Sequence, residues 1–131
     1  MSAAAELQAA LVGALVAADG VAGVASGVFD GPPARAAFPY LVIGETSCFD
    51  WSTKSGRGHE HRVTVSAWDE AGRTGRIFAL LAAVGGAIEA LPTALPGHLI
   101  VNVRPVRERL VRAPGGPWAG SIEYRVRTVA V

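Results

Sequence analysis

The 131-residue chain has a single cysteine, a single lysine and no long uninterrupted apolar run. One cysteine cannot form an internal disulfide, so nothing in the sequence demands an oxidising compartment. The apolar stretch 7–29 is interrupted by Asp19 and four glycines, which argues against a membrane-spanning helix. No lysine or arginine precedes Arg35, so a basic signal-peptide region is not expected. We therefore expect an intracellular protein, or part of an assembly built inside a cell, with no membrane partner.

The sequence also lacks a recognisable phosphate-binding motif. Two glycine-containing stretches, SGRG and GGPWAG, do not stand between a strand and a helix N-terminus, which is where phosphate cradles occur. An enzyme of the P-loop type is therefore not expected.

Metal or nucleophile chemistry would have to come from Cys48, His59 and His61, with His98 as a fourth ligand. Structural zinc sites use tight local pairs such as C-x2-C or H-x3-H, and this spacing matches neither. A Cys48–His59 pair has no nucleophile motif around it. We interpret the histidines as surface residues and the cysteine as a half-buried small hydrophobe. No catalytic residue, metal or cofactor is expected, although a Cys/His enzyme remains an alternative.

The composition is that of one well-packed domain spanning residues 1–131. Half of the residues are hydrophobic and 18% are charged, so a core forms without disulfides or metal. The net charge of +1 is unevenly distributed. Residues 98–131 contain six arginines and two glutamates, which gives +4, so residues 1–97 carry −3.

Apolar periodicity predicts two long helices. In the first, over 2–20, Ser2 is a candidate cap, and Leu7, Leu11 and Leu15 lie in one apolar stripe. The second lies within 69–92, where Asp69 and Glu70 precede its start and Pro92 ends it. Strands are predicted at the following segments: 28–29, 40–45, 61–68, 98–103, 107–112 and 121–131. This order predicts an α+β fold, a mostly antiparallel sheet with two main helices packed on one face.

The segment 45–63 joins two predicted strands, and we interpret it as a long hairpin connection. Ser52–Gly58 has no apolar side chain, so we expect it to be mobile in the free subunit and ordered by a neighbour. Phe49 and Trp51 are the candidate anchors, because buried aromatic side chains often contribute most of the binding energy of an interface.

Arginines dominate the C-terminal third, and their planar guanidinium favours paired carboxylates at interfaces. Glu108 and Glu123 stand among them, and no aromatic residues accompany them at the spacing that base stacking needs. Pairing between or within subunits is therefore favoured over nucleic-acid binding. A small nucleic-acid-binding module nevertheless remains an alternative. The candidate basic residues are Arg104, Arg107, Arg109, Arg125 and Arg127; the candidate acidic partners are Glu45, Asp50, Glu60, Asp69 and Glu70.

Two stretches carry a resemblance to a known family. The order LQAALVGALVAADG, then VFD, then FPYLVIGE, resembles the opening of DUF3168-type proteins from tail gene clusters of phages and gene transfer agents. The second half agrees, because VTVSAWDEAGRTGR runs into an amphipathic helix that ends in AIEAL. The resemblance covers most of the chain and is one of order and spacing.

The resemblance implies a tail terminator, also called a tail completion or tail-to-head joining protein. Such a protein would form a hexameric ring, cap the tail tube, join it to a neck or stopper protein, and let DNA pass through the lumen without sequence-specific binding. The expected location is the tail or neck of a virion or gene transfer agent particle assembled in the bacterial cytoplasm. The family offers no catalytic residues to carry over.

Overall fold

A computed structural model describes all residues, 1–131, as three helices and one five-stranded sheet. The elements in chain order are α1 (Ala3–Ala17), α2 (Asp19–Ala22), β1 (Val28–Asp30), β2 (Tyr40–Asp50), β3 (Gly58–Asp69), α3 (Gly75–Glu89), β4 (His98–Arg112) and β5 (Trp118–Ala130). None of the helices is both long enough and apolar enough to cross a membrane.

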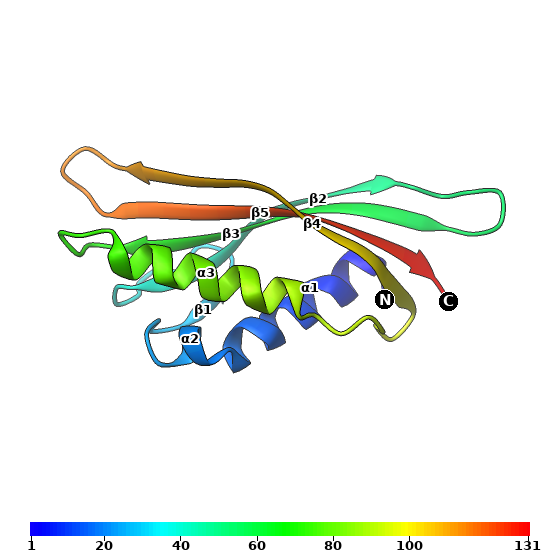
Figure 1. The fold of residues 1–131 in the computed structure, drawn as a ribbon, viewed down its shortest axis with the longest axis horizontal. Coiled ribbons are helices and arrows are strands. Elements are labelled where there is room, and N and C mark those ends of the chain that lie inside the picture. The colour runs from blue at the N-terminus through cyan, green and yellow to red at the C-terminus, as the bar shows by residue number, and fades with distance from the viewer.

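The elements form two layers, with the helices on one face of the sheet and the opposite face uncovered (Figure 1). The strand order is β1-β2-β3-β5-β4; only β1 and β2 are parallel, and every other pair is antiparallel. The predicted α+β class with two main helices on one face is therefore confirmed. The uncovered side of the sheet is called the open face below.

Helix α1 forms as its sequence predicts. The Ser2 hydroxyl accepts a hydrogen bond from the Ala5 amide at 3.1 Å and caps the first turn. Leu7, Leu11 and Leu15 are buried against the sheet, which confirms the apolar stripe. The helix ends at Ala17, slightly before the predicted Asp19–Gly20 stop, and Asp19 begins the short α2.

The central strands β3 and β5 alternate between the two layers. Val63 and Val65 on β3, like Tyr124 and Val126 on β5, are buried against the helices. Strand partners place their intervening neighbours, including the Arg62–Arg125 pair, on the open face. The alternation predicted for both segments is confirmed.

Helix α3 starts later than predicted. Asp69 is the last residue of β3, and the helix begins only at Gly75. Gly85 faces β5, where a Cβ would lie 3.1 Å from the Tyr124 hydroxyl, so close helix–sheet packing explains this glycine. Gly86 has nothing within 4 Å of such an added atom, so the same explanation does not extend to it.

The two strands predicted at 98–103 and 107–112 are one continuous strand, β4. Pro105 lies within this strand, and β4 is the edge of the sheet, where proline is tolerated because its missing amide hydrogen can face away from the neighbouring strand. The irregularity appears instead as two bulges, between Ile100 and Asn102 and between Pro105 and Arg107. A bulge absorbs one extra residue without ending the strand.

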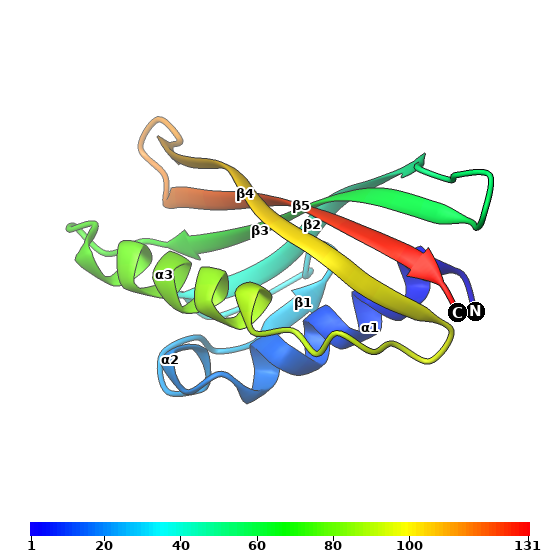
Figure 2. The same cartoon turned by 45° about the vertical axis from the view of Figure 1, so that its right-hand side comes forward.

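Two hairpins extend from opposite ends of the sheet (Figures 1 and 2). The β2–β3 hairpin turns through residues 51–57, and the β4–β5 hairpin turns through residues 113–117. The predicted connection at 45–63 is therefore a hairpin, but much of it is strand: β2 continues to Asp50 and β3 starts at Gly58. The subunit is elongated along its strands, with one projecting turn at each end.

Candidate subunit interface

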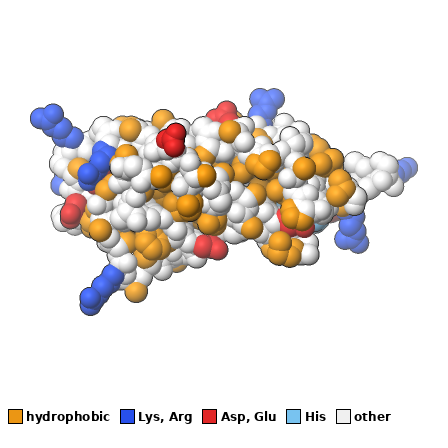
Figure 3. Space-filling model, turned by 90° about the horizontal axis from the view of Figure 1, so that it is seen from below, with side chains coloured by type: hydrophobic (Ala, Val, Ile, Leu, Met, Phe, Trp, Pro, Cys, Tyr) orange, Lys and Arg blue, Asp and Glu red, His pale blue; other side chains and the backbone are white.

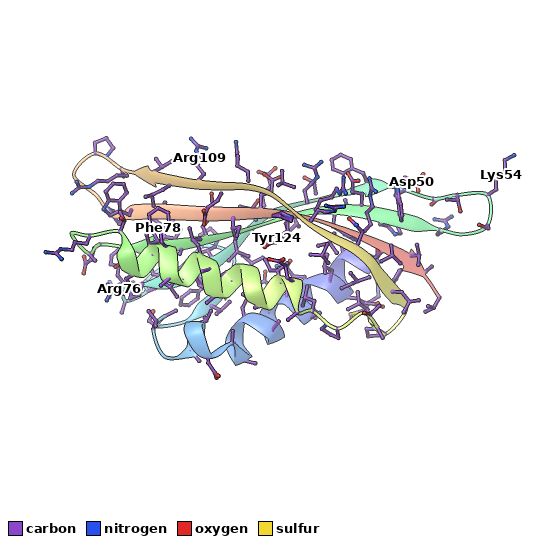
Figure 4. The ribbon with its side chains drawn as sticks, in the orientation of Figure 1. Asp50, Lys54, Arg76, Phe78, Arg109 and Tyr124 are labelled. Carbon is purple, nitrogen blue, oxygen red and sulfur yellow. The ribbon has the colours of Figure 1, made fainter.

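The open face of the sheet brings the predicted arginines together. Strand partners place Arg104 beside Arg125, Asn102 beside Arg127 and Arg107 beside Glu123. Figure 4 shows Arg109 pointing away from the helices on the same side. Alternation along two neighbouring antiparallel strands produces this grouping, since residues two apart in a strand share a face. The five arginines therefore form one surface across β4 and β5.

Two of the arginines on this face are used inside the subunit. Arg127 Nε donates to Glu60 Oε1 at 3.0 Å, and its guanidinium lies 4.8 Å from the centre of the Trp51 ring. Arg62, which sequence analysis did not select, lies 3.5 Å from Glu123 and 3.9 Å from Glu60. Both glutamates on the central strands are therefore already paired.

The arginines of β4 are different, because Arg104, Arg107 and Arg109 form no ion pair within the subunit. Arg125 is intermediate: its Nη2 donates to Asn102 Oδ1 at 3.2 Å, while its buried Nε has no partner. The sheet edge at β4 therefore carries the unneutralised positive charge.

A shallow polar depression of about 440 Å³ lies on the open face. No hydrophobic side chain lines it. Arg107 and Arg109 come from β4, and Glu45 comes from β2. Serine and threonine side chains of the central strands lie between them, so the depression is basic toward β4 and acidic toward β2.

The acidic candidates divide into available and unavailable residues. Asp69 is only 1% exposed and accepts from Arg76 Nε at 2.8 Å, so it cannot reach a neighbouring subunit. The bond to Arg76 holds the pKa of Asp69 below its usual value. Glu45, Asp50 and Glu70 are exposed and form no ion pair. Glu60 is paired as described above.

The two aromatic candidates also differ. Phe49 is 54% exposed and lies opposite Glu60 on the open face. Trp51 is half-buried at the base of the hairpin, beneath Arg127. Phe49 is therefore the aromatic residue available to a neighbour, whereas Trp51 stabilises its own hairpin.

The helix layer presents another kind of surface. Figure 3 shows hydrophobic side chains spread over this side, with the charged groups mostly toward the margins. Phe78 on α3 and Val16 on α1 are both exposed. No charged residue lies between Arg76 and Glu89 along α3.

The three histidines converge between the sheet and α1, although sequence analysis interpreted them as surface residues. The rings of His59 and His61 are 6.1 Å apart, and those of His59 and His98 are 6.2 Å apart. His61 is only 2% exposed, and its Nε2 lies 2.9 Å from the Thr128 hydroxyl. The surface interpretation is therefore wrong for His61, because its position on β3 faces the core.

Burial lowers the pKa of His61 to about 4, and the neighbouring His59 and His98 add to this effect. Cys48, the strand partner of His61, is exposed, so the expectation of a half-buried cysteine is wrong. No group of three or more histidine, cysteine or carboxylate side chains is arranged to hold a metal ion. The cluster offers a buried neutral imidazole and no visible catalytic constellation.

Two buried contacts were missed by sequence analysis. Glu6 accepts from the Gly97 amide at 2.9 Å and lies 2.9 Å from His98 Nδ1, which joins α1 to the start of β4. The bond to His98 lowers the pKa of Glu6. The Tyr124 hydroxyl donates to Glu89 at 2.6 Å and joins β5 to α3. A lone glutamate in a first helical turn indicated only a favourable helix dipole, so its partner 91 residues away carried no sequence signal.

Comparisons with known proteins show which family and which solved structure this chain is similar to. Residues 9–129 match the family described as Tail completion protein gp17. The fold matches a chain in the structure described as the virion of a native gene transfer agent particle, with a TM-score of 0.85 and 28% identity over 98% of both chains. No curated protein matches the chain significantly. The chain belongs to the tail completion protein gp17 family, whose members are structural tail components rather than enzymes.

Proposed function

We propose that this tail completion protein forms a closed hexameric ring that terminates the tail tube and joins it to the neck. The observation that carries the proposal is the match, along 98% of both chains, to a protein of an assembled gene transfer agent virion. The hexameric ring is the assembly that the sequence resemblance implies. The same assembly applies to a phage tail or a gene transfer agent tail.

Within this ring, the tail tube protein binds one face and a neck or stopper protein binds the other. The two hairpins, which project from opposite ends of the sheet, supply contacts in the two directions along the strands. DNA passes through the opening without sequence-specific binding. Surface loops held on a rigid scaffold often carry binding residues, so hairpins of this kind suit contacts between stacked rings.

Neighbouring subunits in a closed ring meet through two different patches, since a head-to-tail contact repeats around the axis. Phe49 and the unpaired arginines of β4 are the interface residues that the geometry supports best. Arg125 contributes through its unpartnered Nε, and Glu70 offers an exposed carboxylate beyond β3. Trp51 and Arg127 act indirectly, by fixing the hairpin base.

The test is native mass spectrometry of the purified protein, alone and after addition of the tail tube protein from the same gene cluster. We expect a six-subunit species, and electron microscopy should show it at one end of each tube. Only monomers, both in solution and on assembled tubes, would contradict the ring.

A second candidate function is sequence-independent DNA binding by the monomer. It is favoured by one observation, the three β4 arginines without an acidic partner. Titration of duplex DNA into the protein at several salt concentrations separates the two functions. Phosphate binding by these arginines gives an affinity for duplex DNA that falls steeply with salt. The ring proposal predicts no measurable DNA affinity in the monomer.

A further inference from the structure

One lateral edge of the sheet, strand β4, has no strand beside it. The segment Thr93–Leu95 covers only its beginning, through bonds such as Ile100 N to Thr93 O at 2.7 Å. From Val101 to Arg112 no strand of the chain pairs with the outer side of β4. An edge of this length is a template for pairing with another chain unless something blocks it.

The opposite lateral edge is open over part of its length. Strand β1 pairs only with Leu41–Ile43 of β2. The remainder of β2, from Gly44 to Asp50, has β3 on one side and no strand on the other. The subunit therefore has two open strand edges on opposite sides of the same sheet.

These two edges carry opposite charge. The β4 edge has Arg104, Arg107 and Arg109 without ion pairs, and the β2 edge has Glu45 and Asp50, also without ion pairs. Two β4 edges would place arginines against arginines, and two β2 edges would place carboxylates against carboxylates. Like charges directly opposite one another destabilise a strand pair, so only the unlike edges fit.

The directions of β2 and β4, and the absence of bulges in parts of both strands, agree with pairing of these unlike edges. Successive antiparallel pairings make β4 run opposite to β2. In a ring every copy has the same orientation relative to the axis, so β4 of one copy and β2 of the next are antiparallel. The stretches Arg107–Arg112 and Thr46–Asp50 each pair within their own sheet without a bulge, and they have similar lengths.

Apolar side chains accompany both edges. Val106 and Val111 on β4 are 45% and 43% exposed, and Phe49 lies exposed on β2. Exposed ion pairs add little each, so burial of these side chains must contribute much of the affinity. Pro105 and the adjacent bulge confine regular pairing to the second half of β4.

We propose that the β4 edge of one subunit lies antiparallel beside the β2 edge of the next, so that the sheet continues from subunit to subunit around the ring. The proposal rests on the proposed ring and names the contact that closes it. Arg107 and Arg109 lie beside Glu45 of the adjacent copy, since all three belong to the open face of the sheet. The partner at this surface is a second copy of the chain rather than nucleic acid.

Cross-linking tests the contact directly, because the only native cysteine, Cys48, lies exposed on the β2 edge. Glu108→Cys adds a second thiol on the β4 edge, at an exposed position on the same face of the sheet as Cys48. A short bismaleimide should then join the double-thiol protein into a ladder that ends at the ring size. Wild-type protein, with Cys48 alone, should not form this ladder, because like edges do not meet. Glu108→Cys combined with Cys48→Ser should not form it either, for the same reason.

Ala79→Cys is the matched control on the exposed side of α3, with Cys48 retained. It should give no ladder. A native ring that is cross-linked through Ala79→Cys but not through Glu108→Cys would overturn the edge contact and leave the ring itself standing. Monomers in native mass spectrometry under all conditions would overturn both.

Charge variants provide a second readout that does not depend on the linker. Arg107→Glu with Arg109→Glu should reduce the ring population at least tenfold while the circular dichroism of the subunit stays unchanged. Adding Glu45→Lys should restore much of the ring population, because Glu45 shares the open face with the two arginines. A ring population that is unchanged in Arg107→Glu with Arg109→Glu would refute the proposal. So would a chain that forms no ring and binds duplex DNA in a salt-sensitive way that these two changes abolish.

Discussion

Arg127 and Glu60 pair across the two central strands, with Arg127 Nε donating to Glu60 Oε1 at 3.0 Å. Strand pairing makes these two residues direct neighbours on the open face. The same guanidinium covers the Trp51 ring. An arginine bonded in this way stabilises its own subunit, whereas an arginine without a partner, such as Arg107, is free for a neighbour.

The first prediction separates these two roles. Arg127→Gln should lower the free energy of unfolding of the subunit by about 1 kcal/mol, because it removes an ion pair and a cation–π contact that are both partly exposed. Arg107→Gln should change the free energy of unfolding of the subunit by less than about 0.5 kcal/mol, but it should weaken ring formation. Urea denaturation of the monomer and native mass spectrometry give the two readouts. Equal losses of monomer stability in the two variants would contradict the assignment of Arg127 to the subunit and Arg107 to the interface.

The second prediction uses adjacent glycines in α3. Gly86→Ala should raise the free energy of unfolding by about 0.5 to 1 kcal/mol, because alanine favours the helix and its methyl group meets nothing within 4 Å. Gly85→Ala should raise the free energy of unfolding less than Gly86→Ala, or lower it, since the added methyl group would lie 3.1 Å from the Tyr124 hydroxyl. That hydroxyl is fixed by its hydrogen bond to Glu89. Thermal unfolding of both variants is the measurement, and an equal gain would show that the helix–sheet contact is loose.

The third prediction concerns acid. His61 is neutral in the folded protein until about pH 4 but takes up a proton near pH 6.5 when unfolded, so stability is full above pH 6.5 and is lost as the pH falls. Between pH 7 and pH 5 the free energy of unfolding should fall by about 1 to 2 kcal/mol from this group. Urea titrations at the two pH values measure it.

His61→Gln is the test variant, and His59→Gln is its control on the same strand. The former should remove most of the pH dependence attributed to His61, and the latter should retain most of it. A pH dependence that is unchanged in His61→Gln would mean that another group causes the loss.

The fourth prediction concerns the β2–β3 turn. The Thr53 amide donates a hydrogen bond to the Gly56 carbonyl oxygen at 2.9 Å. The Ser52 hydroxyl donates to Asp50 Oδ1 at 2.6 Å. These bonds shape the turn but bury none of its side chains, and Lys54 extends from its tip (Figure 4). Hydrogen exchange should be fast at residues 53–57 in the monomer and slower in the assembly. Strong protection in the monomer would contradict this expectation.

The sequence by itself determined the two long helices, the central strands and the faces that they bury. Leucines at helical spacing fix the buried side of α1, and alternation fixes the buried sides of β3 and β5. Those patterns are local, because residues two apart in a strand, or four apart in a helix, share a face whatever the rest of the chain does. The same alternation placed the arginines of β5 on one side, and the order of elements was enough to predict the α+β class.

Only the tertiary structure decided which charged groups are free. Glu60 reaches Arg127 over a separation of 67 residues, and Glu6 reaches His98 over 92, and no local pattern encodes such partners. Asp69 was a candidate in sequence because it is charged, yet its position at the end of β3 buries it beside Arg76. The basic β4 edge and the acidic β2 edge lie on opposite sides of the sheet because the strand order is set by long-range pairing. Pairing across a sheet depends on register between distant segments, and this is the physical reason why the sequence supplied the candidate residues but the fold selected among them.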